Sequence, residues 1–262
     1  MVNFELKSHY DYNDLLEVIH ILRSPGGCPW DIEQTHESIR RGFLEETYEV
    51  IEAINRKDTA LLCEELGDVL MQVVFHADIE SDAGRFTMDE VIDGVVKKLV
   101  FRHPHVFASV QADTTEEVLV NWDILKKEEK GQQTATSTLE SVATTLPQLW
   151  RAEKIQSKAA KAGFDWPSVD GALDKLDEET VELRRAVESG EGVEEELGDV
   201  LFAAVKVARF SGVDPEEALS RTCEKFISRF RKVEESVREQ GASMEDMPLD
   251  ELTALWEKAK RS

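Results

Sequence analysis

The heptapeptide EELGDVL occurs twice in this chain, at residues 64–70 and again at 195–201. Each copy follows a second acidic motif: LEETYEVIEAI at 44–54 precedes the first copy, and LDEETVELRRA at 176–186 precedes the second. Both halves therefore contain EExxE, a short gap and then ExxD. A pair of motifs repeated in the same order indicates a duplicated structural unit, so the chain is expected to build one helical domain twice.

Three further features recur in the same order around these motifs. A Trp next to an Asp lies upstream, a KxxxR spacing lies downstream, and a Trp with nearby bases closes each half. In the first half these are Trp30, Asp31, Lys98, Arg102 and Trp122, and in the second half Asp165, Trp166, Lys225, Arg229 and Trp256. A polar segment rich in Gln, Thr and Ser separates the halves. We predict an N-terminal domain at residues 1–130, a linker at 131–145 and a C-terminal domain at 146–262.

The long segments carry apolar residues at helical spacing, as Ile39, Phe43, Val50 and Ile54 do in the first half. Strand-like alternation is scarce, and the hydrophobic content of 41% is enough for a packed core. The predicted fold is all-α, with two tandem, duplicated helical bundles. Because helices this apolar are well buried against a copy of themselves, we expect each domain to dimerise and the chain to form a homodimer.

The acids of the two motifs differ in their surroundings. Glu45, Glu46 and Glu49 lie within an arc of roughly 100°, as on the solvated face of many helices. The ExxD helix is apolar around most of its circumference, and Glu65 and Asp68 share a narrow strip of it. A helix of this kind is normally buried, and buried carboxylates require a counter-charge. Because the EExxE helix brings only more acids, the pattern indicates a divalent metal ion.

The ligand type predicts which metal. The candidate ligands are all carboxylates, and neither motif has a His or Cys three or four residues away from an acid. Hard oxygen ligands favour Mg²⁺, with Mn²⁺ as a substitute.

The charge of the chain limits its partners. With 54 acidic and 31 basic residues the net charge is −23, which argues against nucleic acids and anionic membranes. Small anionic substrates stay possible because a metal ion reverses the charge locally. The sequence has no apolar run long enough for a membrane helix and no signal-peptide pattern, and its three cysteines are isolated. We therefore expect a cytoplasmic protein.

Basic and aromatic residues at the end of each half are candidates for substrate contacts. Lys225, Arg229 and the bases after Trp256 suit a polyphosphate, and Trp256 suits stacking on a base. Lys126 and Lys127, which follow Trp122, are candidates for the same role. The alternative is that these residues do not bind a ligand: lysines and arginines at helical spacing commonly form solvated surface, and single tryptophans commonly belong to the core.

Several segments together resemble the two-domain form of the MazG family, which hydrolyses nucleoside triphosphates to the monophosphate and pyrophosphate. The resemblance covers nearly the whole chain and rests on the paired EExxE…ExxD motifs, GGCPWD, RHPHVF at 102–107 and KIQSKAAKAGFDW at 154–166. It implies an all-α dimeric fold with Mg²⁺ held by the acids. Carried over by position, the ligands are Glu178 or Glu179, Glu182, Glu196 and Asp199, and in the first half Glu45 or Glu46, Glu49, Glu65 and Asp68. Lys225, Arg229 and Trp256 correspond to nucleotide contacts.

The implied reaction needs no nucleophilic side chain. We expect a metal-activated water to attack the α-phosphate, with one glutamate of the EExxE set as general base. The catalytic candidates are those of the second half, which has more bases near its closing Trp: Glu178, Glu179, Glu182, Glu196 and Asp199. The first half is then structural, regulatory or of different selectivity. The expected role is removal of unwanted nucleotides from the cellular pool.

Other classes stay open at this point. The chain can be a binding module for a nucleotide or alarmone, or a structural helical dimer whose acids only solvate its surface. A dUTP- or dCTP-directed diphosphatase or a phosphoribosyl-ATP pyrophosphatase is the nearest enzymatic alternative.

Overall fold

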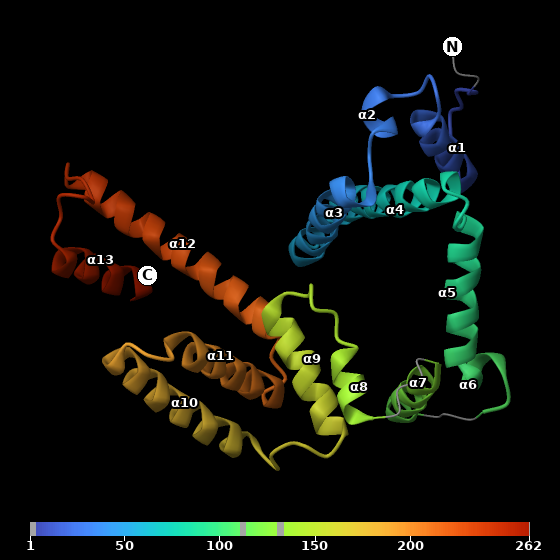
Figure 1. The fold of residues 1–262 in the computed structure, drawn as a ribbon. Helices are drawn as coiled ribbons and strands as arrows, with labels where there is room; N and C mark the ends of the chain where they lie inside the picture. Colours follow the sequence, from blue (N-terminus) through green and yellow to red (C-terminus); the bar gives the residue numbers. More distant parts are fainter. Residues whose placement is uncertain (1–3, 111–113, 130–133, 262) are drawn as a thin grey trace. The chain divides into compact units, whose positions relative to one another are not determined.

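The computed structural model describes residues 4–110, 114–129 and 134–261, and all regular secondary structure in these ranges is helical (Figure 1). The predicted all-α fold is confirmed. The chain divides into two compact units, Met1–Lys126 and Lys127–Ser262. No helix in the described ranges is both long enough and apolar enough to cross a membrane.

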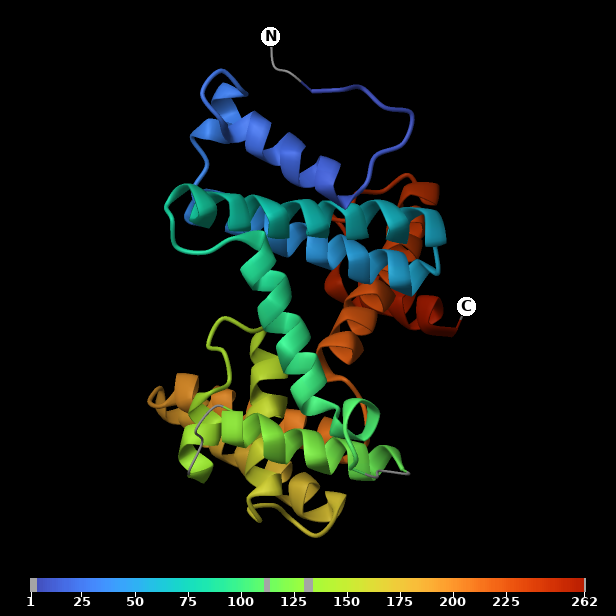
Figure 2. The ribbon, with the colours of Figure 1, turned by 90° about the vertical axis from the view of Figure 1, so that its right-hand side faces the viewer.

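The first unit is built around one long helix hairpin. Helices α3 (His36–Arg56) and α4 (Thr59–Asp82) lie side by side (Figure 2), and α1 (Tyr12–Arg23) packs on α4. Their shared core contains Ile19, Ile39, Val74 and Phe75. The other helices of this unit are α2 (Pro29–Ile32), α5 (Met88–Arg102), α6 (Pro104–Phe107) and α7 (Thr115–Glu129), the last of which crosses the boundary between the units.

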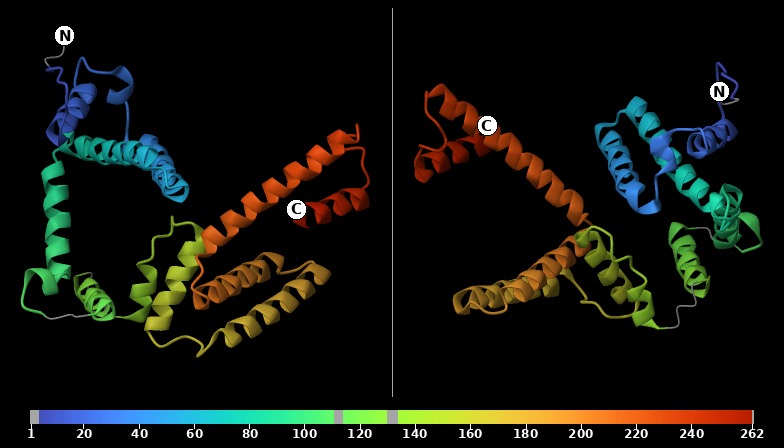
Figure 3. Two further views of the ribbon diagram at one scale, coloured as in Figure 1. Left: turned by 180° about the vertical axis from the view of Figure 1, so that it is seen from behind. Right: turned by 45° about the horizontal axis from the view of Figure 1, so that its top comes forward.

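The second unit repeats the hairpin. Helices α10 (Val169–Ser189) and α11 (Val193–Phe210) pack against each other, and α9 (Gln148–Lys161) packs on α11 (Figure 3). A second hairpin, α12 (Pro215–Glu239) with α13 (Leu249–Arg261), has its own small core that includes Val233 and Val237. Helix α8 (Ala135–Glu140) packs on α9 and lies within the segment 131–145 suggested as a linker. The exact domain limits stay a prediction.

The two hairpin turns begin with the same backbone conformation but with different residues. Helix α3 is followed by Lys57 and α10 by Gly190, and both of these capping residues have a positive φ, of 57° and 78°. Glycine adopts this left-handed conformation without steric cost, whereas lysine does not. The turn of the second hairpin is therefore less strained than that of the first.

The helices that carry the ExxD motifs are only partly covered within the chain. Leu66 and Leu70 on α4 are 52% and 39% exposed, and Leu197 and Leu201 on α11 are 47% and 51% exposed. The expectation that these helices are buried nearly all round is wrong for the single chain. The physical reason is that helices on one side leave the opposite apolar strip without a neighbour.

Candidate functional site

Three carboxylates converge in the second unit. Glu179 and Glu182 are three residues apart on α10, so they lie on the same face of that helix, and Glu196 faces them from α11. One oxygen of each carboxylate lies within 4.8 Å of the others. Glu179 is buried, with 6% of its surface exposed.

The carboxylates of this second-unit cluster repel one another. Burial raises the pKa of Glu196, and the nearby Glu182, Glu179 and Asp199 raise it further. Lys175, one turn before Glu179 on α10, supplies one compensating charge: its Nζ lies 2.6 Å from Glu179 Oε1 and 2.8 Å from Glu178 Oε1. A single ammonium group cannot neutralise four carboxylates, so the cluster keeps uncompensated negative charge, which favours a bound cation.

The first unit contains the equivalent cluster. Glu46 and Glu49 on α3 meet Glu65 on α4, again with oxygens within 4.8 Å of one another. Glu65 is buried, and burial raises its pKa, as does the neighbouring Glu49. Burial also raises the pKa of Glu46, with Asp68 and Glu49 contributing.

Both clusters fit a divalent metal ion. Each combines three converging carboxylate oxygens with incomplete charge compensation, which is the donor set that hard cations such as Mg²⁺ and Mn²⁺ prefer. The groups needed to hold a metal ion in each half are therefore present on two adjacent helices.

The remaining predicted acids lie at the edges of these clusters. Asp199 lines a pocket together with Glu179, and Asp68 is close enough to influence the pKa of Glu46. Glu45 is exposed and accepts a 2.8 Å hydrogen bond from Arg41 Nε. Glu178 is also exposed and pairs with Lys175. Neither Glu45 nor Glu178 belongs to a three-carboxylate group.

The structure does not bring the predicted nucleotide contacts to the acids within the second unit. Lys225 and Arg229 lie on α12 and Trp256 on α13. Helix α12 packs mainly on α13 and α9 and has only a small contact with α11, whereas α10 packs on α11 (Figure 3). Trp256 packs on the core of its own hairpin, with its ring centroid 4.9 Å from that of Phe226. Lys126 and Lys127 belong to α7, but their side chains are outside the described part of the structure.

A pocket of about 230 Å³ adjoins the second carboxylate cluster. It combines aromatic, small, basic and acidic side chains: Phe164, Trp166, Ala172, Lys175, Glu179, Asp199, Phe202, Ala203 and Lys206. Sequence reasoning did not find its two lysines. The available signals were the spacing of Lys175 four residues before Glu179, and a single lysine within the apolar run LFAAVKVARF.

The loop before α10 is fixed to α11 by an ion-pair network. Asp165 accepts a 2.9 Å hydrogen bond from Lys206 Nζ and another from Arg209. The Lys206 ammonium group also lies 4.9 Å from the centroid of the Trp166 ring. A Cβ atom on Gly171 would lie 2.5 Å from Trp166 Cδ1, so the absence of a side chain at Gly171 allows the indole to sit against α10.

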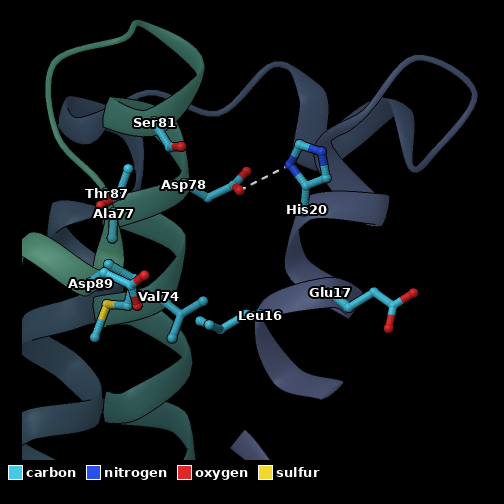
Figure 4. A pocket seen from close by; sticks show the side chains of 10 residues that line it. Leu16, Glu17, His20, Val74, Ala77, Asp78, Ser81, Thr87 and Asp89 are labelled. Carbon is cyan, nitrogen blue, oxygen red and sulfur yellow. Dashed lines mark hydrogen bonds and ion pairs between the residues drawn. The ribbon is translucent and has the colours of Figure 1, made fainter. Parts of the chain in front are cut away.

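A larger pocket in the first unit lies away from the acidic cluster. It has a volume of about 360 Å³ between α1, α4 and α5 and includes His20 and Asp78 (Figure 4). Asp78 is 13 residues from Glu65 on α4, or about 20 Å along the helix. His20, Asp78 and Asp82 form a possible metal-binding group, but Arg23 already contacts both aspartates at 2.8 and 3.0 Å. This cluster is therefore a compensated ion-pair network.

Comparison with known proteins gives consistent matches. A family model described as the MazG nucleotide pyrophosphohydrolase domain matches residues 34–107 and 168–234. The nucleoside triphosphate pyrophosphohydrolase/pyrophosphatase MazG of Thermotoga maritima is 43% identical over 249 residues, covering 95% of both chains. The nucleoside triphosphate pyrophosphohydrolase of Escherichia coli is 44% identical over 252 residues, 94% of this chain and 96% of the relative. The uncharacterized protein YabN of Bacillus subtilis is 45% identical over 257 residues, which cover 97% of this chain and 52% of that protein.

The two matches to the family model coincide with the two carboxylate clusters. The first contains α3 and α4, and the second contains α10 and α11. The predicted tandem arrangement of two related helical domains is therefore confirmed.

Proposed function

The chain belongs to the MazG family of nucleotide pyrophosphohydrolases, and we propose that it hydrolyses nucleoside triphosphates to the monophosphate and pyrophosphate at its second carboxylate cluster. The observation that carries this proposal is the convergence of Glu179, Glu182 and Glu196 beside a pocket with two lysines and three aromatic rings. The reaction needs acidic side chains to hold a cation, basic side chains to contact the phosphates and aromatic rings to stack on the nucleobase.

The side chains divide into distinct roles. Glu179, Glu182, Glu196 and Asp199 are the proposed ligands for Mg²⁺, which supplies Lewis-acid activation of water and offsets phosphate charge when bound. One glutamate of the EExxE set takes the proton from water. Lys175 is within reach of these carboxylates and offers a positive charge to the triphosphate. Phosphoryl transfer depends mostly on such positioning and electrostatics, so no serine or cysteine nucleophile is required.

We also propose that the chain acts as a homodimer. Leu197 and Leu201 on α11 are about half exposed, and so are Phe226 and Phe230 on α12. Apolar strips of this kind are covered when a second copy packs on them. In such a dimer, Lys225, Arg229 and Trp256 of one chain contact the carboxylates of the partner chain, which they do not reach within their own chain.

A mixing experiment tests this shared site. An Asp199→Asn variant and a Lys225→Ala variant are each expected to be inactive alone. If the partner supplies Lys225, each heterodimer contains one intact site of two, and because about half of the dimers in an equal mixture are heterodimers, the mixture recovers roughly a quarter of normal activity. No recovery, with mixed dimers verified by mass, would place Lys225 in its own chain's site, and a Lys225→Ala variant that is active alone would place it outside any site.

The expected setting is the cytoplasm, where the enzyme would remove unwanted nucleoside triphosphates. Its three cysteines are free, which suits a reducing compartment. With its negative charge it is expected to bind neither nucleic acids nor membranes.

A product assay tests the reaction itself. Purified protein is incubated with a panel of ribo- and deoxyribonucleoside triphosphates, with Mg²⁺ or with EDTA, and the products are separated. Monophosphate with pyrophosphate in Mg²⁺, and neither in EDTA, is the expected result. Diphosphate with inorganic phosphate would contradict the cleavage position, and the absence of turnover would favour a nucleotide-binding module.

A further inference from the structure

The pocket beside the second carboxylate cluster has two chemically different ends. At one end Lys175, Glu179 and Asp199 form the charged part. At the other end Lys206 lies 4.9 Å from the ring centroid of Trp166. Asp199 and Lys206 are seven residues apart on α11, so they lie on one face of that helix, about 10 Å from each other along its axis.

Lys206 is held in place by contacts that leave it facing the pocket. Its side chain is 8% exposed, and its Nζ donates to Asp165 Oδ1 at 2.9 Å. Trp166 is fixed as well, because its indole sits against the bare backbone of Gly171. A fixed ammonium group beside a fixed aromatic ring is a rigid arrangement for recognition of a planar polar ligand.

We propose that this aromatic end receives the nucleobase and that Lys206 donates a hydrogen bond to a carbonyl on the base edge. This inference rests on the proposed hydrolysis of nucleoside triphosphates. An ammonium group has only donors, so it favours the carbonyl of guanine, uracil or thymine. Adenine and cytosine carry an amino group at the corresponding position and leave the lysine without that acceptor. The enzyme therefore prefers keto bases.

The surroundings of Lys206 favour a neutral carbonyl over a phosphate. Asp165 shares the charge of Lys206 and would repel a polyanion. Aromatic rings line this end, whereas the lysine that pairs directly with the acidic cluster is Lys175. In a nucleotide the sugar separates the α-phosphate from the base, which matches the separation of the two ends.

The test compares kcat/KM for dGTP and dUTP with kcat/KM for dATP and dCTP. The wild type is expected to favour the keto bases roughly tenfold, as one charge-assisted hydrogen bond would give. Lys206→Met is expected to reduce this ratio to near one. The matched control is Arg209→Met, which also removes a partner of Asp165 but does not line the pocket, and it is expected to leave the ratio unchanged.

Two results would overturn the proposal while the hydrolytic function stands. One is an equal fall in kcat/KM for all four substrates in Lys206→Met, as loss of a phosphate contact or of structure would produce. The other is a wild type without preference for keto bases. Lys206→Gln, which keeps a hydrogen-bond donor, serves if the methionine variant fails to fold, and it is expected to retain part of the preference.

A wild type that cleaves no nucleotide would refute the proposed function instead. The pocket is then tested by calorimetric binding of GMP, UMP, AMP and CMP. Tighter binding of GMP and UMP that Lys206→Met abolishes supports the base contact, and equal binding of all four overturns it. Gly171→Ala, which forces Trp166 to move, is expected to weaken binding of every nucleotide.

Discussion

The two carboxylate clusters have the same acids but different neighbours. When the EExxE motifs are aligned, Lys175 of the second half corresponds to Gly42 of the first. Lys175 contacts Glu178 and Glu179, whereas Gly42 has no side chain to offer. The first cluster therefore lacks the positive charge that the second holds beside its buried glutamate.

The space beside the acids also differs between the two halves. Ala203 and Lys206 of the second half correspond to Gln72 and Phe75 of the first. A Cβ atom on Gly42 would lie 3.2 Å from Gln72 Nε2, so the glutamine side chain occupies the space next to Gly42. Phe75 is buried in the core. The two halves thus share the converging carboxylates but differ in the charges and space around them, and we propose that this difference makes the second half the catalytic one.

The largest expected effect comes from removing the same acid in each half. Asp199→Asn is expected to lower kcat/KM by roughly a hundredfold or more, because the fourth carboxylate beside the substrate pocket is lost. Asp68→Asn is expected to leave kcat/KM within about twofold of the wild type. Steady-state release of pyrophosphate measures both variants. A larger loss in Asp68→Asn than in Asp199→Asn would reverse the assignment of the two halves.

Removing the lysine beside the second cluster, or adding a lysine beside the first, is expected to have an intermediate effect, on metal binding. Lys175 and a metal ion compete for Glu179, so Lys175→Met is expected to strengthen metal binding at the second cluster roughly tenfold. Gly42→Lys is expected to weaken binding at the first cluster by a similar factor. Gln72→Ala accompanies it, since the glutamine occupies the space that the new side chain needs.

Calorimetric titration with Mn²⁺ measures these affinities. Each cluster is studied with the other disabled, by Asp199→Asn or Asp68→Asn, so that one site is observed at a time. The double variant Gly42→Lys with Gln72→Ala is compared with Gln72→Ala alone, which isolates the new charge. Equal affinities with and without a lysine at either position would show that this difference between the halves does not control metal binding.

Much of the fold follows from the sequence. The repeated EExxE…ExxD pattern predicts two helix hairpins, and spacings of three residues place Glu179 with Glu182 on one helix face. Their convergence with Glu196 then follows from pairing of the two helices. The metal ligands and substrate contacts themselves stay predictions.

The surroundings of the acids do not follow from spacing. Lys206 meets Asp165 and Trp166 across 41 and 40 positions of sequence, through contacts between a loop and α11 that periodicity does not encode. Periodicity also indicates that the ExxD helices are apolar nearly all round, but it does not identify what covers them. The half-exposed Leu201 shows that this cover is incomplete in the single chain.

The smallest expected effect concerns a polar network that only the first hairpin has. Glu80 is buried, and hydrogen bonds from Arg85 and His36 lower its pKa to about 2. The His36 ring also stacks on that of His76. The corresponding positions of the second half are Val169, Val207 and Ser211, which cannot form such a network.

Glu80→Gln is therefore expected to lower the melting temperature by a few degrees at neutral pH. A depressed pKa means that the carboxylate stabilises the fold above its unfolded-state pKa, and that this stabilisation is lost as the pH falls through the folded-state value of about 2. The difference between variant and wild type should thus shrink as the pH is lowered from the ordinary glutamate range to about 2. Glu234→Gln, an exposed position on α12, is the matched control and is expected to melt like the wild type throughout. A difference that does not change with pH would mean that shape and packing at Glu80, and not its charge, distinguish the first hairpin from the second.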